Sequence, residues 1–317
     1  MALKGDRPYD RYPFYKKLRE GRKGLCRYAF QGIRWRFEGE GRGTEVETRG
    51  LHLLVRFNPC SHGGEIVGMN KEKAVEISNL TYRYPDGNLA LQNVNLSIFA
   101  GESVAIIGHN GAGKSTLLLH LNGILKENGA VKIFGKSVNG KNLKSIRRMV
   151  GMVFQDPDDQ LFCPTVYDDV VFGPINMGMN DKEAKERVTE VLGRIGLSGF
   201  EKRSAHHMSA GEKKRAAIAT VLSMEPKILV FDEPTSNLDP KMRRVLIDLI
   251  KSFPETKIIV SHDLPIALEL CQRIIILEKG RIVEDGSVKD ILGKREMLER
   301  YEIDPIYNCQ FCDMLKS

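Results

Sequence analysis

The nine residues GHNGAGKST, at positions 108–116, decide the fold that this chain is expected to adopt. They follow a continuous apolar run, Ser103–Ile107, and lead into a second apolar stretch at 116–125. A buried strand, a glycine-rich loop and a helix in this order form a phosphate-binding loop (P-loop), because backbone N–H groups and the helix N-terminus attract phosphate oxygens. We therefore expect nucleotide to contact Gly108, His109, Asn110, Gly111, Ala112, Gly113, Lys114, Ser115 and Thr116.

Four polar side chains in two stretches supply the chemistry that this loop needs. Lys114 brings a compact positive charge toward the β- and γ-phosphates, and the Ser115 hydroxyl is a ligand for Mg²⁺. A second buried strand ends in two carboxylates, in ILVFDEP at 228–234. Asp232 can hold Mg²⁺ through water, and Glu233 can orient or polarise an attacking water. A solvated acidic turn is the alternative for this pair, and the P-loop upstream argues against it.

Strands and helices alternate along the rest of the body. Alternating apolar positions predict two half-buried antiparallel strands, at 73–80 and 91–98. Apolar residues at helical spacing predict helices at 181–195 and 241–252. Continuous apolar runs predict further buried strands, at 149–154, 228–231, 257–260 and 274–277. This order favours an α/β fold with a mainly parallel sheet, a P-loop NTPase (RecA-like) core beside an antiparallel β subdomain.

The positive charge of the chain lies almost wholly in its first fifth. Residues 1–68 hold 14 Lys/Arg against 8 Asp/Glu, whereas the rest of the chain holds 34 against 33. The only candidate strand in that region is 51–57, and nothing periodic surrounds it. Residues 1–68 are therefore expected to be a disordered extension or an upstream stretch that is not translated, and the normal start is expected near Met69.

Neither a membrane span nor a secretion signal is predicted. No run of about 20 apolar residues occurs, and no apolar signal-peptide core follows the first residue. We expect a cytosolic chain whose six cysteines are reduced thiols. Cys309 and Cys312 form a lone C-x-x-C that lacks two further ligands at matched spacing, so plain thiols are favoured over a zinc site.

From about residue 75 to 291 the sequence resembles the nucleotide-binding subunit of ABC transporters. The resemblance rests on further motifs in the family's order, which are Tyr84, Gln155, MSAGEKKR at 208–215, SNLD at 236–239 and His262 in VSHD. It implies an ABC ATPase domain at 72–292, with an ABC-type helical subdomain at roughly 156–212 and a tail at 293–317.

The resemblance also implies roles for these residues. Gln155 would contact Mg²⁺ and couple to a membrane subunit, and His262 would sense the γ-phosphate. Tyr84 would stack on adenine, with Tyr82 as its competitor. Ser209, Gly211 and Asp239 would contact the nucleotide that is bound to the opposite subunit. The expected catalytic set is then Glu233, His262 and Gln155, and the expected metal set is Ser115, Gln155 and Asp232.

The 208–215 motif departs from the family's Leu-Ser-Gly-Gly-Gln at two positions. Ala210 replaces the first glycine and adds a Cβ where backbone must approach phosphate. Glu212 replaces glutamine and puts a negative charge in the first turn, which suits the helix dipole but opposes phosphate. Ser209 remains as the expected helix N-cap. We predict a functional but weakened site between two subunits.

Several longer stretches resemble the energy-coupling-factor transporters for cobalt, nickel and vitamins. They are YRYPDG at 82–87, FQDPDDQLF at 154–162, Thr165-Val166, Asp168-Asp169, FGP at 172–174 and EKKRAAIA at 212–219. This resemblance implies ATP and Mg²⁺ as ligands and a peripheral position at the cytoplasmic face of the cell membrane. Two ATPase subunits, identical or different, would clamp a membrane scaffold (T) protein that embraces a substrate-capturing (S) protein. The transported substrate is not readable from the sequence.

Two other functions fit parts of the sequence. An ABC-type ATPase acting on nucleic acid or ribosomes would use the basic residues 1–68, but such proteins usually carry two cassettes or a long insertion, and this chain has neither. No nucleic-acid partner is therefore expected. A regulatory ATP-binding module without hydrolysis is disfavoured, because Glu233 and His262 are both present.

Overall fold

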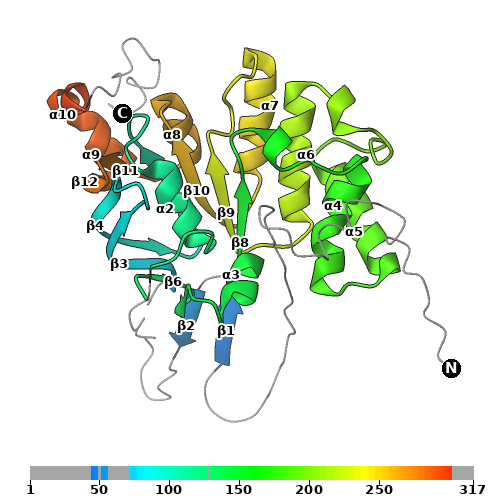
Figure 1. Cartoon of the computed structure of the whole chain (residues 1–317), viewed down its shortest axis with the longest axis horizontal. Helices are drawn as coiled ribbons and strands as arrows, with labels where there is room; N and C mark the ends of the chain where they lie inside the picture. The colour runs from blue at the N-terminus through cyan, green and yellow to red at the C-terminus, as the bar shows by residue number, and fades with distance from the viewer. Residues whose placement is uncertain (1–43, 49–50, 56–71, 128, 302–317) are drawn as a thin grey trace, which may run out of the picture.

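A computed structural model describes residues 44–48, 51–55, 72–127 and 129–301 of the chain. At its centre is a six-stranded sheet in the order β12-β11-β5-β10-β9-β8 (Figure 1). All neighbours pair in parallel except β12, which runs antiparallel to β11. The strands are β5 (Ser103–Ile107), β8 (Val150–Val153), β9 (Ile228–Asp232), β10 (Thr256–Ser261), β11 (Arg273–Glu278) and β12 (Arg281–Ser287). The expected parallel sheet is confirmed.

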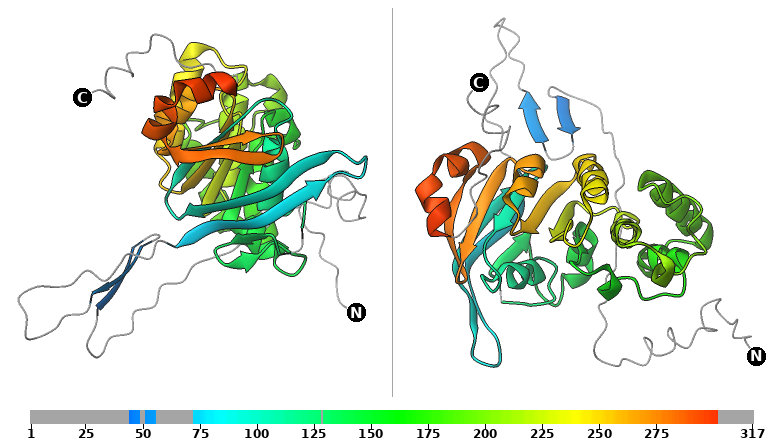
Figure 2. Two further views of the ribbon diagram at one scale, coloured as in Figure 1. Left: turned by 90° about the vertical axis from the view of Figure 1, so that its left-hand side faces the viewer. Right: turned by 90° about the horizontal axis from the view of Figure 1, so that it is seen from above.

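A second, antiparallel sheet has the order β4-β3-β6-β7. Its strands β3 (Lys73–Arg83) and β4 (Leu89–Phe99) extend beyond the predicted ranges 73–80 and 91–98, and the short strands β6 (Val131–Ile133) and β7 (Lys136–Ser137) complete it. Figure 2 shows the long β3–β4 ribbon projecting past the central sheet. The antiparallel β subdomain is therefore confirmed.

A separate hairpin pairs β1 (Thr44–Thr48) with β2 (Leu51–Val55) in antiparallel register. Strand β2 falls within the candidate strand at 51–57. The other residues of 1–68, and the Cys309–Cys312 pair, lie outside the described residues, so the expectations for them stay predictions.

The central sheet is covered on both faces, as its continuous apolar strands require. Successive side chains of β5 alternate, with Ala105 and Ile107 in one buried cluster and Val104 and Ile106 in the other. The second cluster includes the antiparallel sheet, α2 (Lys114–Leu121) and α3 (Leu143–Met149). The first cluster includes α4 (Val166–Met177), α5 (Asp181–Arg194), α6 (Ala210–Leu222), α7 (Pro240–Lys251) and α8 (Leu264–Leu270).

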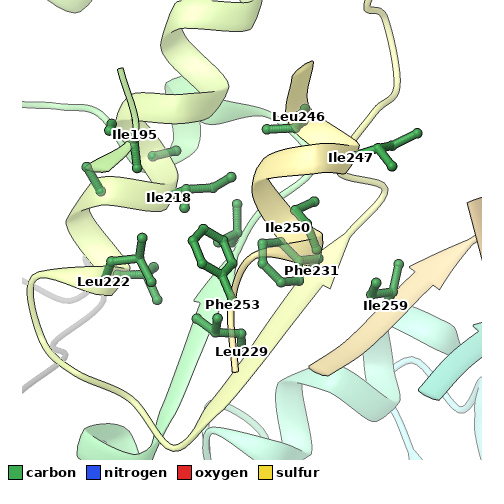
Figure 3. Close-up of a cluster of buried hydrophobic side chains, with 14 of the residues drawn as sticks. Ile195, Ile218, Leu222, Leu229, Phe231, Leu246, Ile247, Ile250, Phe253 and Ile259 are labelled. Carbon is green, nitrogen blue, oxygen red and sulfur yellow. The ribbon is translucent and has the colours of Figure 1, made fainter. Parts of the chain in front are cut away.

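The helical subdomain is joined to the central sheet by a continuous core. Figure 3 shows Ile218 and Leu222 of α6 and Ile250 of α7 in one cluster with Phe231 of β9. Helices α4 and α5 lie inside the range 156–212, and α6 continues ten residues past it. Each of the helices α4 to α7 begins at a residue whose side-chain oxygen accepts a backbone N–H, and these caps are Thr165, Asn180, Ser209 and Asp239.

Helix α2 is shorter than the apolar stretch 116–125 suggests. It ends at Leu121, and Asn122 follows as the C-cap. Gly123 has a φ of +70°, a left-handed conformation that favours glycine and ends helices. The apolar residues beyond it, Ile124 and Leu125, are therefore partly buried but lie outside the helix. The remaining helices are α9 (Val288–Gly293) and α10 (Arg295–Arg300). Within the described ranges, none of the helices has the length and apolar character needed to cross a membrane.

One carboxyl in the helical subdomain makes the stability of the fold depend on pH. Asp169 of α4 is 4% exposed, and its Oδ1 accepts the N–H groups of Phe162 (3.0 Å) and Cys163 (2.9 Å). Burial raises the pKa of the Asp169 carboxyl to about 6, even though these hydrogen bonds lower it. Since the ordinary value is 3.8, the unfolded chain releases the proton first. The free energy of unfolding therefore falls as the pH rises from about 4 to about 6, and this contribution is level above that range.

Asp169→Asn is expected to stabilise the protein near neutral pH. The amide oxygen still accepts the two N–H groups, and no buried charge forms. The gain in the free energy of unfolding should grow between pH 4 and pH 6 and reach about 2–3 kcal/mol at pH 7.5. Urea unfolding at several pH values measures it. Asp248→Asn, at an exposed carboxylate of α7 away from Asp169, is the control without this gain. A gain that does not change with pH would contradict the interpretation.

Candidate active site

The predicted site residues meet at one edge of the central sheet. Strands β5, β10 and β9 are parallel neighbours in register, with Ile107 paired to Ser261 and Val260 paired to Asp232. The carboxyl ends of parallel strands lie at the same edge. The P-loop after β5, the Asp232-Glu233 pair at the end of β9 and His262 after β10 are therefore brought together, although they lie far apart in the sequence.

The P-loop wraps a buried ammonium group. The Lys114 side chain is 7% exposed, and its Nζ donates to the carbonyls of Gly108 (2.6 Å) and His109 (2.9 Å). Burial lowers the pKa of Lys114, while the carboxylates Glu233 and Asp232 raise it. The amine lies in front of the first turn of α2, where a phosphate group would also meet the helix N-terminus. This arrangement fits a polyphosphate ligand.

Two glycines make that loop sterically possible. Gly113, just before α2, has a φ of +103°, and a Cβ there would lie 2.6 Å from the Ala90 carbonyl oxygen. A Cβ on Gly108 would lie 2.1 Å from the Leu277 carbonyl oxygen. Because real Cβ atoms do not approach backbone oxygen so closely, both positions require glycine for this course of the chain.

A hydroxyl and a carboxylate form the expected metal-binding pair. Ser115 Oγ donates to Asp232 Oδ2 at 3.0 Å. Burial raises the pKa of Asp232, whereas the hydrogen bond from Ser115 lowers it. A hydroxyl oxygen beside a carboxylate suits Mg²⁺, which prefers hard oxygen ligands and keeps several waters. The third predicted ligand, Gln155, has an exposed side chain in the loop after β8, and its backbone carbonyl accepts from Lys214 Nζ at 3.2 Å.

The Glu233 carboxylate is held on both oxygens. Oε1 accepts the backbone N–H of His262 at 2.9 Å and lies 2.8 Å from His262 Nδ1, and Oε2 accepts the Ser261 hydroxyl at 3.2 Å. Glu233 is 7% exposed, whereas the His262 side chain is 67% exposed. The glutamate is thus fixed at the sheet edge beside a histidine that faces outward, an arrangement suited to orienting a water molecule.

Tyr84 lies against the P-loop, as expected for a residue near the base of a nucleotide. Its hydroxyl is 3.1 Å from Thr116 Oγ1. The competing residue, Tyr82, packs edge-on against both Tyr84 and the buried His120. Of the other loop residues, His109 and Asn110 are exposed, and Ala112 is buried. The structure therefore brings Tyr84 to the loop and places Tyr82 in an aromatic contact behind it.

The residues expected to face a second subunit lie at helix starts. Ser209 and Glu212 form a capping box, with the Ser209 N–H bonded to the Glu212 carboxylate at 2.8 Å. That hydrogen bond lowers the pKa of Glu212. Ser209 and Ala210 are exposed, while a Cβ on Gly211 would lie 3.2 Å from the Met242 side chain. Asp239 is exposed and caps α7 by accepting the N–H groups of Lys241 and Met242.

Three further polar residues lie at this edge, and the sequence motifs assigned a role to none of them. Ser261 binds Glu233, Lys214 reaches Gln155 and Glu233, and Gln160 joins the loop after β8 to the carbonyl of Ala217 in α6 (2.8 Å). Only for Lys214 did the sequence contain a pattern that indicates a buried position. It lies three residues after Gly211 and four before Ile218, on the buried face of its helix, where a lysine is out of place without a partner.

An open cavity of about 610 Å³ lies between the loop after β8 and the start of α6. Asp232 and Asn237 reach it from the sheet edge, and Lys213 and Lys214 reach it from α6. Lys213 Nζ binds the Asp158 carboxylate at 2.7 Å, which fixes one wall of the cavity to the helix. The cavity is lined by residues 154–159, Met208, Ala210, Lys213, Lys214, Asp232 and Asn237.

Comparisons with known proteins agree with this site. Residues 91–236 match the ABC transporter family. A Geobacter sulfurreducens protein assigned as an ABC transporter ATP-binding protein is 50% identical over 239 residues, which cover 75% of this chain and 96% of that protein. The energy-coupling factor transporter ATP-binding protein EcfA of Carboxydothermus hydrogenoformans is 49% identical over 231 residues, covering 72% of this chain and 85% of that protein.

A solved structure agrees as well. CbiO1 from Clostridium perfringens, described as part of the ABC transporter complex CbiONQ, shares 38% sequence identity with a TM-score of 0.65. The match covers 74% of this chain and 96% of that one. The chain therefore belongs to the ABC transporter family of ATP-binding proteins, and it is an ABC-type ATPase.

Proposed function

We propose that this ATPase powers an energy-coupling-factor importer that takes up a transition-metal ion such as cobalt or nickel, or a vitamin. Its partners would be a second ATPase subunit, a membrane scaffold (T) protein and a substrate-capturing (S) protein, and it would sit at the cytoplasmic face of the membrane. The identity to EcfA and CbiO1 supports the importer type. The observation that carries the ATPase chemistry is the meeting of Lys114, Ser115, Asp232 and Glu233 at one sheet edge.

Each residue of that edge has a chemical task in the proposed reaction. Lys114 and the backbone N–H groups of the P-loop bind the β- and γ-phosphates and neutralise their charge. Ser115 and Asp232, with Gln155, would hold Mg²⁺, which when bound screens the negative charge of the phosphate oxygens. Glu233 orients the attacking water and accepts its proton, and His262 contacts the γ-phosphate.

The proposed working unit is a dimer with nucleotide between the subunits. In one chain the start of α6 presents the exposed residues Ser209 and Ala210. As a capped helix N-terminus it offers partial positive charge to the phosphates that the other subunit's P-loop holds. Glu212 in the first turn opposes that attraction, so the shared site is expected to be weaker than one with glutamine there.

The cavity beside the loop after β8 is the proposed groove for a coupling segment of the T protein. It is open and lies between Gln155 on the sheet side and Met208 on the helical side. Its acidic wall contains Asp156, Asp158 and Asp159. Opening and closing of the ATPase dimer would move this groove as a rigid body and so carry the energy of hydrolysis to the membrane proteins.

Purification from native membranes tests the proposed assembly. The full chain with an affinity tag is captured from detergent-solubilised membranes, and the co-purifying proteins are identified by mass spectrometry. We expect two polytopic membrane proteins and a stoichiometric second ATPase subunit. Capture of RNA or ribosomal protein with a steep dependence on salt, and of no membrane protein, would overturn the importer assignment.

Ala210→Gly is expected to strengthen the shared site. Removing the Cβ lets the start of α6 approach the phosphates that the other subunit holds, so the ATPase rate should rise severalfold and the KM for ATP should fall. Steady-state ATPase kinetics at protein concentrations that favour the dimer measure both. Ala205→Gly, at a buried alanine before the same helix, is the control. Rate and affinity equal to those of the wild type would show that the Ala210 departure does not matter.

A further inference from the structure

Lys214 of α6 is a buried ammonium group to which none of the family motifs assigned a role. Its side chain is 6% exposed. Its Nζ donates to the Gln155 carbonyl (3.2 Å), the Glu233 carbonyl (3.3 Å) and the Ser236 hydroxyl (3.2 Å). An ammonium group has three N–H donors, and each of these has an acceptor here.

The three acceptors come from two segments of the active-site edge. Gln155 lies in the loop after β8, and Glu233 and Ser236 lie in the connection from β9 to α7. Burial lowers the pKa of Lys214, while the Asp156 and Glu233 carboxylates raise it. A charged group is buried at a cost that only good hydrogen bonding offsets, so its position argues for a specific task.

The Glu233 backbone needs such a restraint. Its φ is +44°, a left-handed conformation that non-glycine residues rarely adopt. The Glu233 N–H donates to the Val260 carbonyl at 3.0 Å, and the Glu233 carbonyl accepts both Lys214 Nζ and the Ser236 hydroxyl (2.9 Å). Main chain and carboxylate are thus fixed from opposite sides, by β10 on one side and by α6 with Ser236 on the other.

We propose that Lys214 is a positioning residue, which holds the Glu233 main chain in its left-handed conformation and so aims the carboxylate at the attacking water. This inference rests on the proposed role of Glu233. Lys214 touches neither phosphate nor water in this scheme and acts only through the glutamate. The same ammonium ties Gln155, in the loop after β8, to that glutamate, so a shift of α6 moves both together.

The test compares three variants of the full chain by ATPase kinetics and by binding of a fluorescent ATP analogue. Lys214→Met keeps the length of the side chain and removes its donors. We expect its kcat to fall tenfold to 100-fold, the effect of misplacing a catalytic group by about 1 Å, with KM and analogue affinity within about threefold of wild type. Lys214→Arg restores donors and charge and should recover most of the rate.

Lys257→Met is the matched control. Lys257 is also a buried lysine, 8% exposed, and its Nζ donates to the Phe253 carbonyl at 2.7 Å, away from the site edge. It should keep the wild-type kcat even where its melting temperature falls. If Lys214→Met does not fold, Ser236→Ala takes its place, because it removes one hydrogen bond to the same carbonyl and should lower kcat severalfold at constant KM.

The outcomes separate this inference from the proposed function. Wild-type kcat in Lys214→Met, or in Ser236→Ala where that variant replaces it, overturns the positioning role. A parallel loss of analogue binding, or an arginine variant no better than methionine, also overturns it. These readings apply when the wild type hydrolyses ATP and Glu233→Gln does not. A wild type without ATPase activity, or an active Glu233→Gln, counts instead against the proposed role of Glu233, and the positioning role then fails with it.

Discussion

Glu233→Gln is expected to lower kcat for ATP hydrolysis by on the order of 1,000-fold, while ATP binding stays within about twofold of wild type. The substituted side chain has the same shape, and its amide oxygen still accepts the His262 N–H. It cannot take a proton from water, so the loss falls on the chemical step. Steady-state ATPase assays give kcat, and titration with a fluorescent ATP analogue gives the affinity.

The control for this variant is a glutamate with a comparable environment away from the site. Glu269 of α8 has an 18% exposed side chain and pairs with Arg244 and Lys251. Glu269→Gln should leave kcat unchanged. Wild-type turnover in Glu233→Gln would remove this residue from the reaction and leave His262 or Gln155 as the candidate for orienting water.

Lys114→Met is expected to weaken ATP binding by on the order of 100-fold. The ammonium group is the only side-chain cation among the predicted P-loop residues apart from a histidine, and a hydrogen bond to a charged group contributes about 1.5–3 kcal/mol. Calorimetric titration with ATP measures the affinity. The fold itself should not suffer, because burial already lowers the pKa of this lysine and methionine fills the same space without a charge.

Lys257→Met again serves as the control, since it removes a buried lysine of similar exposure far from the phosphates. A matched pair of melting curves shows whether a loss of ATP binding in Lys114→Met reflects the site or the fold. Unchanged affinity in that variant would mean that phosphate is held by the backbone N–H groups of the loop alone.

Local patterns predicted the parts of the site that each segment determines by itself. The buried strand Ser103–Ile107 and the helix after GHNGAGKST place the loop without any knowledge of the rest. The cap at Ser209 follows from a hydroxyl residue three positions before a glutamate, which is the pattern of a capping box. Parallel pairing of the predicted strands then brings Asp232 and His262 to the same edge.

Contacts between distant segments were not predictable in this way. Helical spacing puts Lys214 on the buried face of α6, but its partners depend on how α6 packs against Glu233 and Gln155. The early end of α2 depends on Gly123, where a Cβ would lie 2.3 Å from the Leu143 side chain of α3. In both cases the local structure depends on a contact with a residue distant in the sequence, and the spacing of residue types within one segment does not predict that contact.

Helix α6 has an exposed start at Ala210 and a buried lysine, Lys214, one turn later. In the proposed dimer these two positions act on different nucleotides. Ala210 would face the ATP held by the other subunit, whereas Lys214 acts on the Glu233 of its own chain. Genetic complementation would expose this division of labour. Lesions at 210 and 214 placed in one subunit would impair both ATP sites, but the same lesions placed in opposite subunits would fall on a single ATP and leave the second site intact.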